Sequence, residues 1–317
     1  MKKLLITKTL PDATLNAARA RFDVTLRSEN KGLTVEEAAA ALRDYDAILP
    51  TLGDGFTADA FEGEIRCGVL ANFGVGYNHI DVAAATAAGV AVSNTPDAVT
   101  DATADIGLTL ILSACRRAGE GERIVRAGAW KGWQPTQMLG THVTGKTVGI
   151  VGMGRIGQAV ARRCHYGFEM PVLYFNRSPK AVDLPARQVE TLHDLMAQAD
   201  IIVVTVPGGG SNSNLIDAAA LAAMKPTGIF VNIARGDVVD EEALIAALQT
   251  GQIAGAGLDV YVKEPFVPEA LRALENVVLL PHLGTAALEV REAMGQMALD
   301  NIIAWDEGRP LPQGVLS

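Results

Sequence analysis

A glycine-rich turn between a predicted strand and a predicted helix constrains this chain more than any other feature of its sequence. The apolar run 148–151 leads directly into Gly152, Gly154 and Gly157, and residues 158–163 continue in a helical pattern. This G-x-G-x-x-G spacing between strand and helix is typical of dinucleotide-binding folds. We expect Gly152 to allow the tight turn, Gly154 to let the backbone approach a pyrophosphate, and Gly157 to let the helix pack closely on the strand. The alternative, a turn that merely requires glycine, is weaker because strand, turn and helix occur together.

The rest of the chain fits an α/β protein. Short apolar runs rich in β-branched residues alternate with alanine-rich helical segments, which predicts βαβ units and parallel sheets. Because 317 residues exceed one ordinary domain, we expect two doubly wound parallel-sheet domains with a cleft between them. We predict a flavodoxin-like substrate domain over residues 1–98 and 287–317, and a Rossmann dinucleotide-binding domain over residues 99–286.

The apolar pattern also places the individual elements. In the first domain we expect helices after Pro11, after the capping box that begins at Thr34 and after His79, and strands at 3–7, 24–26, 47–49, 69–72 and 90–93. One long helical segment over 99–127 leads into the second domain, and a last helix over 288–305 is expected to return to the first. Six strands are expected in the second domain, at 147–151, 172–175, 201–206, 228–233, 255–260 and 277–280.

Charge and cysteine content exclude several classes of function. The net charge of -9 leaves no basic stripe that could neutralise a phosphate backbone, which argues against nucleic-acid binding. Cys67, Cys115 and Cys164 are far apart and show neither a CxxC nor a Cys/His ligand spacing, so we expect reduced thiols and no metal site. No apolar stretch approaches the roughly 18 residues that would cross a bilayer. We therefore expect a soluble cytoplasmic protein that binds no membrane.

The residues after the second strand of the nucleotide fold predict which dinucleotide is preferred. An NAD site usually presents Asp or Glu there, to bond the ribose 2′-hydroxyl. Here the strand ends in Asn176, Arg177 and Ser178. A neutral residue followed by a cation removes the repulsion against a 2′-phosphate and supplies it with a charged partner. We therefore predict that NADP(H) is preferred over NAD(H), the alternative being that Arg177 is a solvated loop charge.

Three ionisable side chains follow three successive predicted strands of the second domain. Arg235 follows the strand 228–233, Glu264 lies just past 255–260, and His282 follows 277–280. Each alone could be an ordinary solvated or structural residue. Because ligands of open parallel sheets bind beyond the carboxyl ends of the strands, their joint placement predicts a catalytic site.

These residue types fit the reduction of a 2-keto acid. Addition of hydride to a ketone leaves an alkoxide that needs a proton, and histidine is the side chain poised near neutral pH to supply it, so His282 is the predicted acid/base. A carboxylate at Glu264 would orient the imidazole and favour its charged form. Arg235 would present two parallel donors to the substrate carboxylate and stabilise charge on the carbonyl oxygen.

Taken together, these motifs resemble a known family over essentially the whole chain. They lie at 72–77, 148–157, 231–237, 256–260 with Glu264-Pro265, and 280–285. The sequence resembles the D-isomer-specific 2-hydroxyacid dehydrogenases, particularly the glyoxylate/hydroxypyruvate reductases. The resemblance implies the same roles for Arg235, Glu264 and His282, and reduction of glyoxylate or hydroxypyruvate to the 2-hydroxy acid.

The resemblance also implies further binding residues and a partner. Backbone amides of the loop formed by Phe73, Gly74, Val75 and Gly76 would bind the substrate carboxylate, and Leu52 would line the pocket. The chain would form a homodimer through the loop that holds Trp130. Asp259 would lie near the nicotinamide carboxamide, and the other implied cofactor contacts are Thr103, Arg155, Ile156, Val206, Pro207, Ile233, Ala234, His282 and Gly284.

Some features leave alternatives open. Residues 206–214 replace the more usual Pro-x-Thr-x-x-Thr-like loop of the family with a run of glycine, serine and asparagine. Trp130 and Trp133 are either packed at the dimer arm or in contact with substrate, and packing is the more common use of such residues. Two alternative functions are a reductase of broad specificity for bulkier 2-keto acids and a nucleotide-sensing, corepressor-like binding module without turnover.

Overall fold

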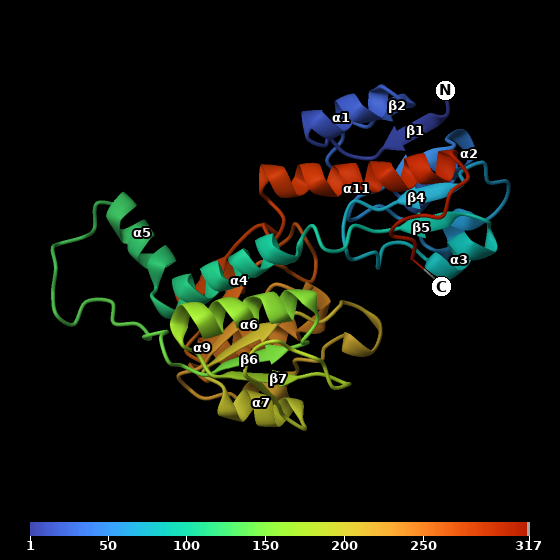
Figure 1. Cartoon of the computed structure of the whole chain (residues 1–317). Helices are drawn as coiled ribbons and strands as arrows, with labels where there is room; N and C mark the ends of the chain where they lie inside the picture. Colours follow the sequence, from blue (N-terminus) through green and yellow to red (C-terminus); the bar gives the residue numbers. More distant parts are fainter. Residues whose placement is uncertain (316–317) are drawn as a thin grey trace. The chain divides into compact units, whose positions relative to one another are not determined.

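The computed structural model describes residues 1–315, which divide into two compact units. Unit 1 comprises Met1–Val99 together with the chain from Thr285 onward, and unit 2 comprises Thr100–Gly284. Each unit has its own parallel sheet with helices on both faces (Figure 1). Within residues 1–315, no helix combines the length and the apolar character that a membrane span needs.

Unit 1 contains a five-stranded parallel sheet in the order β2-β1-β3-β4-β5. All five expected strands are present: β1 (Lys3–Ile6), β2 (Asp23–Leu26), β3 (Ala47–Leu49), β4 (Val69–Ala71) and β5 (Ala91–Ser93). The strand order 2-1-3-4-5 is that of flavodoxin-like folds, in which ligands bind outside the carboxyl ends of the strands. The flavodoxin-like prediction for this part of the chain is therefore confirmed.

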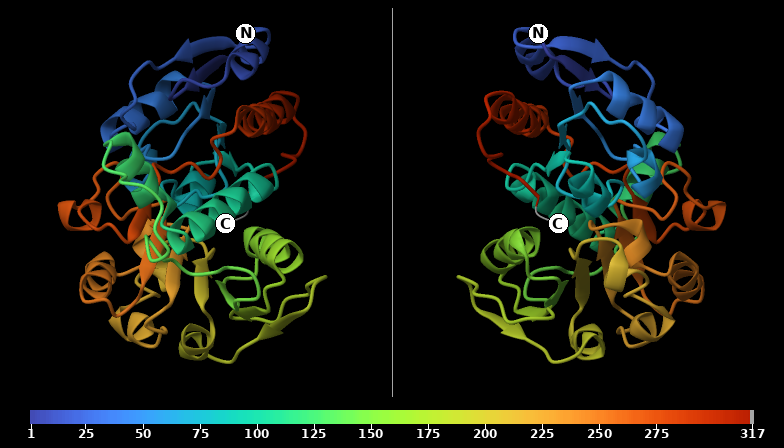
Figure 2. Two further views of the ribbon diagram at one scale, coloured as in Figure 1. Left: turned by 90° about the vertical axis from the view of Figure 1, so that its left-hand side faces the viewer. Right: turned by 90° about the vertical axis from the view of Figure 1, so that its right-hand side faces the viewer.

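Helices cover both faces of this sheet because side chains alternate along its strands. Leu4 and Ile6 face one layer of helices, whereas Leu5 between them faces the other. Figure 2 shows the first layer, in which the N-terminal α1 and the C-terminal α11 lie side by side although they are far apart in sequence. The helices are α1 (Asp12–Arg19) and α11 (Leu288–Asp306) on one face, and α2 (Val35–Asp44), η1 (Ala58–Phe61) and α3 (Val82–Ala87) on the other.

Unit 2 contains a seven-stranded parallel sheet in the order β12-β11-β10-β9-β6-β7-β8. The order reverses at β6, which lies between β7 and β9 and gives the topological switch point of a Rossmann fold. The strands are β6 (Val148–Val151), β7 (Val172–Phe175), β8 (Ala186–Gln188), β9 (Ile201–Val204), β10 (Ile229–Asn232), β11 (Gly255–Leu258) and β12 (Val277–Leu279). The six expected strands are all present.

The prediction of six strands was one too few, because it missed β8. This strand has only three residues, all of them partly or fully exposed, and it pairs with β7 at the edge of the sheet. An edge strand without a fully buried side chain needs no apolar run, so hydrophobic periodicity does not reveal it.

Helices also cover both faces of the second sheet. Val148 and Ile150 of β6 pack toward α4 and α6, whereas Val151 packs on the opposite side. Figure 1 shows α4 and α6 on one side of the sheet and α7 on the other. The helices of unit 2 are α4 (Thr100–Cys115), α5 (Ala118–Arg126), α6 (Arg155–Phe168), α7 (Leu192–Gln198), η2 (Gly210–Asn212), α8 (Ala218–Ala222), η3 (Gly236–Val238), α9 (Glu241–Gln249) and α10 (Glu269–Arg272).

The single long helical segment expected over residues 99–127 is two helices. The chain breaks at Arg117, which adopts a left-handed conformation with a φ of 52°. The guanidinium of Arg117 donates two hydrogen bonds to the carboxylate of Glu120, at 2.8 and 2.7 Å, which stabilises the new helix start. Arg117 is neither glycine nor proline, and the nearby Gly119 and Gly121 lie inside the second helix, so the apolar periodicity did not locate the break.

Candidate active site

The glycine-rich turn joins β6 to α6 at the switch point of the second sheet. Gly152 has a φ of 98°, a conformation that side chains other than glycine rarely adopt. A Cβ atom at Gly157 would lie 2.2 Å from the carbonyl oxygen of Gly152, so only glycine allows the helix to pack here. A Cβ at Gly154 would meet no atom within 4 Å, which leaves open space above the turn. The turn therefore fits a dinucleotide pyrophosphate.

The N-terminus of α6 supports the same fit. Gly154 is the N-cap and supplies no side-chain hydrogen bond to the first turn. The first N–H groups of a helix have no partner within the helix, and together with the helix dipole they favour an anion. The helix has 14 residues, so its dipole is fully developed at this end.

The end of β7 lies against the glycine turn. The side-chain oxygen of Asn176 accepts a hydrogen bond from Met153 N at 3.1 Å, and its amide nitrogen donates to Ser178 O at 2.8 Å. Arg177 and Ser178 are exposed, and Arg177 donates to the hydroxyl of Ser211 at 3.0 Å. No acidic residue stands at this strand end, so an anionic group near the turn would meet a cation there.

The three predicted catalytic residues follow β10, β11 and β12, whose carboxyl ends lie along one edge of the sheet. His282 Nδ1 donates to Glu264 Oε2 at 2.8 Å. The other carboxylate oxygen of Glu264 accepts from Tyr261 N at 3.0 Å, so the side chain is held at both oxygens. The imidazole is 30% exposed, and its Nε2 remains available to a ligand.

The charge state of Glu264 follows from its surroundings. Burial raises the pKa of this carboxyl, but the hydrogen bond from His282 and the nearby charges of His282 and Arg235 outweigh it and leave the pKa below its ordinary value. Glu264 is therefore ionised at neutral pH, which makes it an acceptor and His282 Nδ1 a donor. This contact leaves Nε2 as the atom that can exchange a proton with a substrate oxygen.

A buried aspartate fixes the backbone that carries His282. Asp259 is 1% exposed, and its carboxylate accepts hydrogen bonds from Leu283 N at 2.6 Å and Gly284 N at 2.8 Å. Burial raises the pKa of Asp259, although these two bonds oppose the shift. His282 itself has a φ of 54°, a strained conformation that the surrounding bonds maintain.

Arg235 is a partly buried cation at the same edge of the sheet. Its guanidinium donates to Ala234 O at 2.7 Å, and within residues 1–315 it forms no ion pair. Burial lowers the pKa of Arg235, while the charges of Glu264 and Asp237 oppose that shift. A cation that is partly desolvated and has no paired carboxylate is suited to bind an anion.

Other predicted cofactor residues lie around Asp259 and at neighbouring strand ends. The hydroxyl of Thr103 donates to Gly284 O at 3.2 Å, which joins α4 to the loop after β12. Ile233 and Ala234 are buried directly after β10, and Val206 and Pro207 come shortly after β9. Arg155 and Ile156 open α6. The structure thus places all the predicted cofactor residues at helix starts and strand ends of unit 2.

The residues predicted to bind the substrate carboxylate through backbone amides follow β4 in unit 1. The carbonyls of Gly74 and Gly76 accept from the Asn72 side chain at 2.9 and 3.1 Å, and the carbonyl of Val75 accepts from Asn94 at 2.9 Å. Within the described part of the chain, the N–H groups of Val75 and Gly76 have no acceptor. The loop therefore presents free backbone donors, with Phe73 at its start.

Sequence reasoning assigned no role to Asn72 or Asn94, which hold this loop. The signal was an asparagine at the end of one predicted strand, 69–72, and another directly after the strand predicted at 90–93, because asparagine side chains commonly bond nearby backbone groups. Leu52, the remaining predicted substrate residue, is 43% exposed, and its carbonyl accepts from Lys8 Nζ at 2.8 Å.

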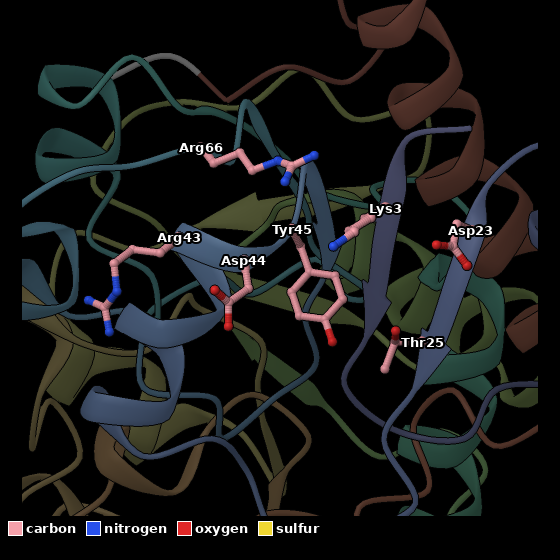
Figure 3. A pocket seen from close by; sticks show the side chains of 7 residues that line it. All are labelled: Lys3, Asp23, Thr25, Arg43, Asp44, Tyr45 and Arg66. Atoms are coloured by element: carbon pink, nitrogen blue, oxygen red, sulfur yellow. The ribbon is translucent and has the colours of Figure 1, made fainter.

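A surface pocket of about 430 Å³ in unit 1 contains none of the predicted site residues (Figure 3). It includes the first residues of β1 and β2 and the end of α2, which leads into β3, and this places it at the amino ends of the strands. Ligands of such sheets bind at the opposite edge, so the pocket is not the candidate site. It is lined by Lys3, Asp23, Thr25, Arg43, Asp44, Tyr45 and Arg66.

Comparisons with known proteins agree with the fold and the turn. Residues 108–284 match the family described as D-isomer specific 2-hydroxyacid dehydrogenase, NAD binding domain. The chain is 43% identical to a glyoxylate reductase of Thermococcus kodakarensis over 98% of this chain and 95% of the relative. It is 37% identical to a glycerate dehydrogenase of Hyphomicrobium methylovorum over 96% of this chain and 95% of the relative.

A solved structure gives the same result. The NADPH-dependent glyoxylate/hydroxypyruvate reductase of Sinorhizobium meliloti, in complex with NADP and malonate, superposes with a TM-score of 0.89 at 34% identity. The match covers 99% of this chain and 96% of that chain. The chain therefore belongs to the D-isomer specific 2-hydroxyacid dehydrogenases and is glyoxylate reductase-like, an oxidoreductase with an NAD-binding domain of Rossmann type.

Proposed function

We propose that this dehydrogenase reduces glyoxylate or hydroxypyruvate with NADPH, using His282 as the acid, Glu264 as its partner and Arg235 as the anchor of the substrate carboxylate. One observation carries the proposal. Glu264 accepts a hydrogen bond from His282 at 2.8 Å, and on the same edge of the sheet lies Arg235, a cation that has no ion-pair partner among residues 1–315. The names of the relatives from Thermococcus and Sinorhizobium support these two small substrates.

Each residue has a defined part in the proposed step. When bound, the nicotinamide supplies the hydride that C2 of the keto acid accepts. His282 Nε2 then gives its proton to the former carbonyl oxygen, and the product is the 2-hydroxy acid. Glu264 stabilises the positive charge of the imidazole before the transfer. Arg235 binds the carboxylate and lowers the energy of negative charge on the reacting oxygen.

The loop formed by Phe73, Gly74, Val75 and Gly76 remains our candidate for further contacts to the substrate carboxylate, and Leu52 for the lining of the substrate pocket. The free N–H groups of Val75 and Gly76 support this role, because a carboxylate accepts well from backbone amides. The two asparagines that bind the loop carbonyls keep these donors oriented.

The preference for NADPH rests on the end of β7. Asn176, Arg177 and Ser178 provide a cation and no carboxylate, which suits a 2′-phosphate and lacks the usual partner of a ribose 2′-hydroxyl. The Sinorhizobium relative, whose name states NADPH dependence, supports the same preference.

Initial rates test the whole proposal. Glyoxylate, hydroxypyruvate, pyruvate and phenylpyruvate are each assayed with NADPH and with NADH, following absorbance at 340 nm. We expect the two small acids and NADPH to give the highest kcat/KM. Highest activity with phenylpyruvate would favour a broad reductase of bulkier acids, higher kcat/KM with NADH would contradict the cofactor preference, and nucleotide binding without turnover would favour a sensing module.

We further propose a homodimer in which a second copy covers the arm formed by α5 and residues 127–142. Figure 1 shows this arm projecting from the rest of unit 2, and α5 has no buried residue. Its apolar side chains are exposed to an unusual degree: Val125 61%, Trp130 55%, Trp133 79% and Leu139 68%. A cluster of exposed apolar side chains on one projecting arm is typical of an interface between subunits.

Sedimentation velocity measures this assembly. We expect the wild type to sediment as a dimer and Trp133→Ser to shift the equilibrium toward the monomer, because an interface aromatic is lost. Tyr166→Ser removes an aromatic of similar exposure, 63%, from α6 and should leave the dimer unchanged. A monomeric wild type would contradict the proposal, and so would equal behaviour of the two variants.

The cysteines take no part in this chemistry. Cys67, Cys115 and Cys164 are buried free thiols. Burial raises the pKa of Cys67 and Cys164 to about 12 and that of Cys115 to about 11, so all three are protonated and unreactive at neutral pH. A reducing, cytoplasmic location fits this pattern and stays a prediction.

A further inference from the structure

The loop 206–214, which departs from the family pattern, is held by hydrogen bonds to Asp237, two residues after Arg235. It turns sharply at Gly209 and Gly210, whose φ values are 75° and 54°. Gly209 N donates to Asp237 Oδ2 at 2.6 Å, and Asn214 N donates to the backbone oxygen of Asp237 at 2.8 Å. Asp237 thus binds the loop at two points and fixes its position relative to β10.

An internal contact keeps the loop in shape. Asn212 is only 8% exposed, and its side-chain amide donates to Pro207 O at 2.9 Å. The adjacent Ser211 is exposed, and its hydroxyl accepts the hydrogen bond from Arg177 Nη1 at 3.0 Å. The side chain of Ser211 therefore connects the loop after β9 to Arg177 at the end of β7. Asp237 and Asn212 hold the loop that carries Ser211.

We propose that Ser211 is a specificity-determining residue that positions the Arg177 guanidinium for the 2′-phosphate of NADPH. This inference rests on the proposed cofactor preference. The contact uses one of the five N–H donors of arginine and leaves the others for phosphate oxygens. A free arginine side chain loses rotamer entropy when it is fixed, so an arginine that is already held binds an anion at a lower entropic cost.

The geometry separates this role from a purely structural one. Ser211 and Arg177 are both exposed, and they come from two loops that each have other attachments. A single hydrogen bond between exposed side chains contributes little to stability. Loss of the hydroxyl should therefore leave thermal stability nearly unchanged and act on the recognition of the 2′-phosphate alone.

Binding of nucleotide fragments tests the proposal without turnover. Isothermal titration calorimetry on the full chain compares adenosine 2′,5′-bisphosphate with 5′-AMP, which lacks the 2′-phosphate. We expect Ser211→Ala to weaken binding of the bisphosphate about three- to tenfold and to leave that of 5′-AMP unchanged. Ser211→Thr keeps a hydroxyl and should restore most of the affinity.

A matched control and two contrary outcomes complete the experiment. Ser213→Ala removes an exposed serine of the same loop that makes no side-chain hydrogen bond within the described residues, and we expect it to bind both fragments as the wild type does. The proposal is overturned if Ser211→Ala weakens both fragments equally, since that result indicates general loop damage. It is also overturned if the variant binds the bisphosphate with unchanged affinity.

Arg177→Ala distinguishes failure of this inference from failure of the proposed cofactor preference. If Arg177→Ala leaves bisphosphate binding unchanged, the preference itself is wrong and the role of Ser211 falls with it. If Arg177→Ala weakens bisphosphate binding but Ser211→Ala does not, the inference alone is wrong. In the double variant, the Ser211 substitution should have no further effect, because its partner is gone.

Discussion

Replacing His282 with asparagine is expected to lower kcat for glyoxylate about 10²- to 10⁴-fold while NADPH still binds. The alkoxide formed by hydride addition then has no side chain beside it that releases a proton near neutral pH. Asparagine suits the site structurally because it tolerates the left-handed backbone, with a φ of 54°, better than most residues. Stopped-flow single turnovers measure the chemical step, and quenching of protein fluorescence by NADPH measures cofactor binding.

A graded series makes this test specific to the proton. Glu264→Gln keeps a side chain that can accept from His282 Nδ1 but removes its negative charge, so we expect a loss smaller than that of His282→Asn. His193→Asn replaces a histidine of α7, on another part of unit 2, and should leave kcat unchanged. Near-normal turnover by His282→Asn would contradict its assignment as the acid.

The sequence predicted this site because two rules act together. Chemistry selects histidine, carboxylate and arginine for the reduction of a 2-keto acid, and parallel strands bring the residues that follow them to one edge. Glu264 and His282 are 18 positions apart, yet β11 and β12 pair in register and their following loops meet at 2.8 Å. The glycine turn was predictable for a similar reason, since the turn needs the positive φ of Gly152 and the close packing of the helix at Gly157 leaves no room for a Cβ atom.

Features without a periodic or steric signal were not predictable. The short edge strand β8 has no fully buried side chain, and the residue at the helix break, Arg117, is neither glycine nor proline. The supports of the two loops were also missed, because the position of Asn72 at a strand end is only a general signal and Asp237 acts on a backbone group through a contact that only the folded chain defines. Sequence patterns report on burial and turns, whereas such contacts depend on exact distances between neighbouring loops.

Replacing Arg235 with methionine is expected to lower kcat/KM for glyoxylate about 10²- to 10³-fold, through both KM and kcat. KM rises because the substrate carboxylate loses its cationic anchor. The value of kcat falls because charge on the reacting oxygen is no longer stabilised in the transition state. Methionine keeps the Cβ and Cγ atoms that pack beside Gly208, so the loop 206–214 retains this neighbour.

The same substitution should leave thermal stability unchanged or raise it, which separates a functional cation from a structural one. Burial disfavours the charge of Arg235 and lowers its pKa, the charges of Glu264 and Asp237 oppose this only in part, and the side chain forms no ion pair within residues 1–315. Removing such a charge should lower the free energy of unfolding little or not at all, because residues kept for function often reduce the stability of the folded state. Arg272→Met, at an exposed arginine of α10, is the matched control and should change neither property.

Steady-state kinetics and calorimetric melting measured on the same samples decide between the two roles. A large loss of kcat/KM with an unchanged or higher Tm is the signature of an anion-binding residue. Arg235→Lys refines the test, because lysine keeps the charge but not the planar pair of donors, so an intermediate loss is expected. A fall in Tm that accompanies the lost activity would instead mean that Arg235 holds the fold together, and the substrate carboxylate would then need a different anchor.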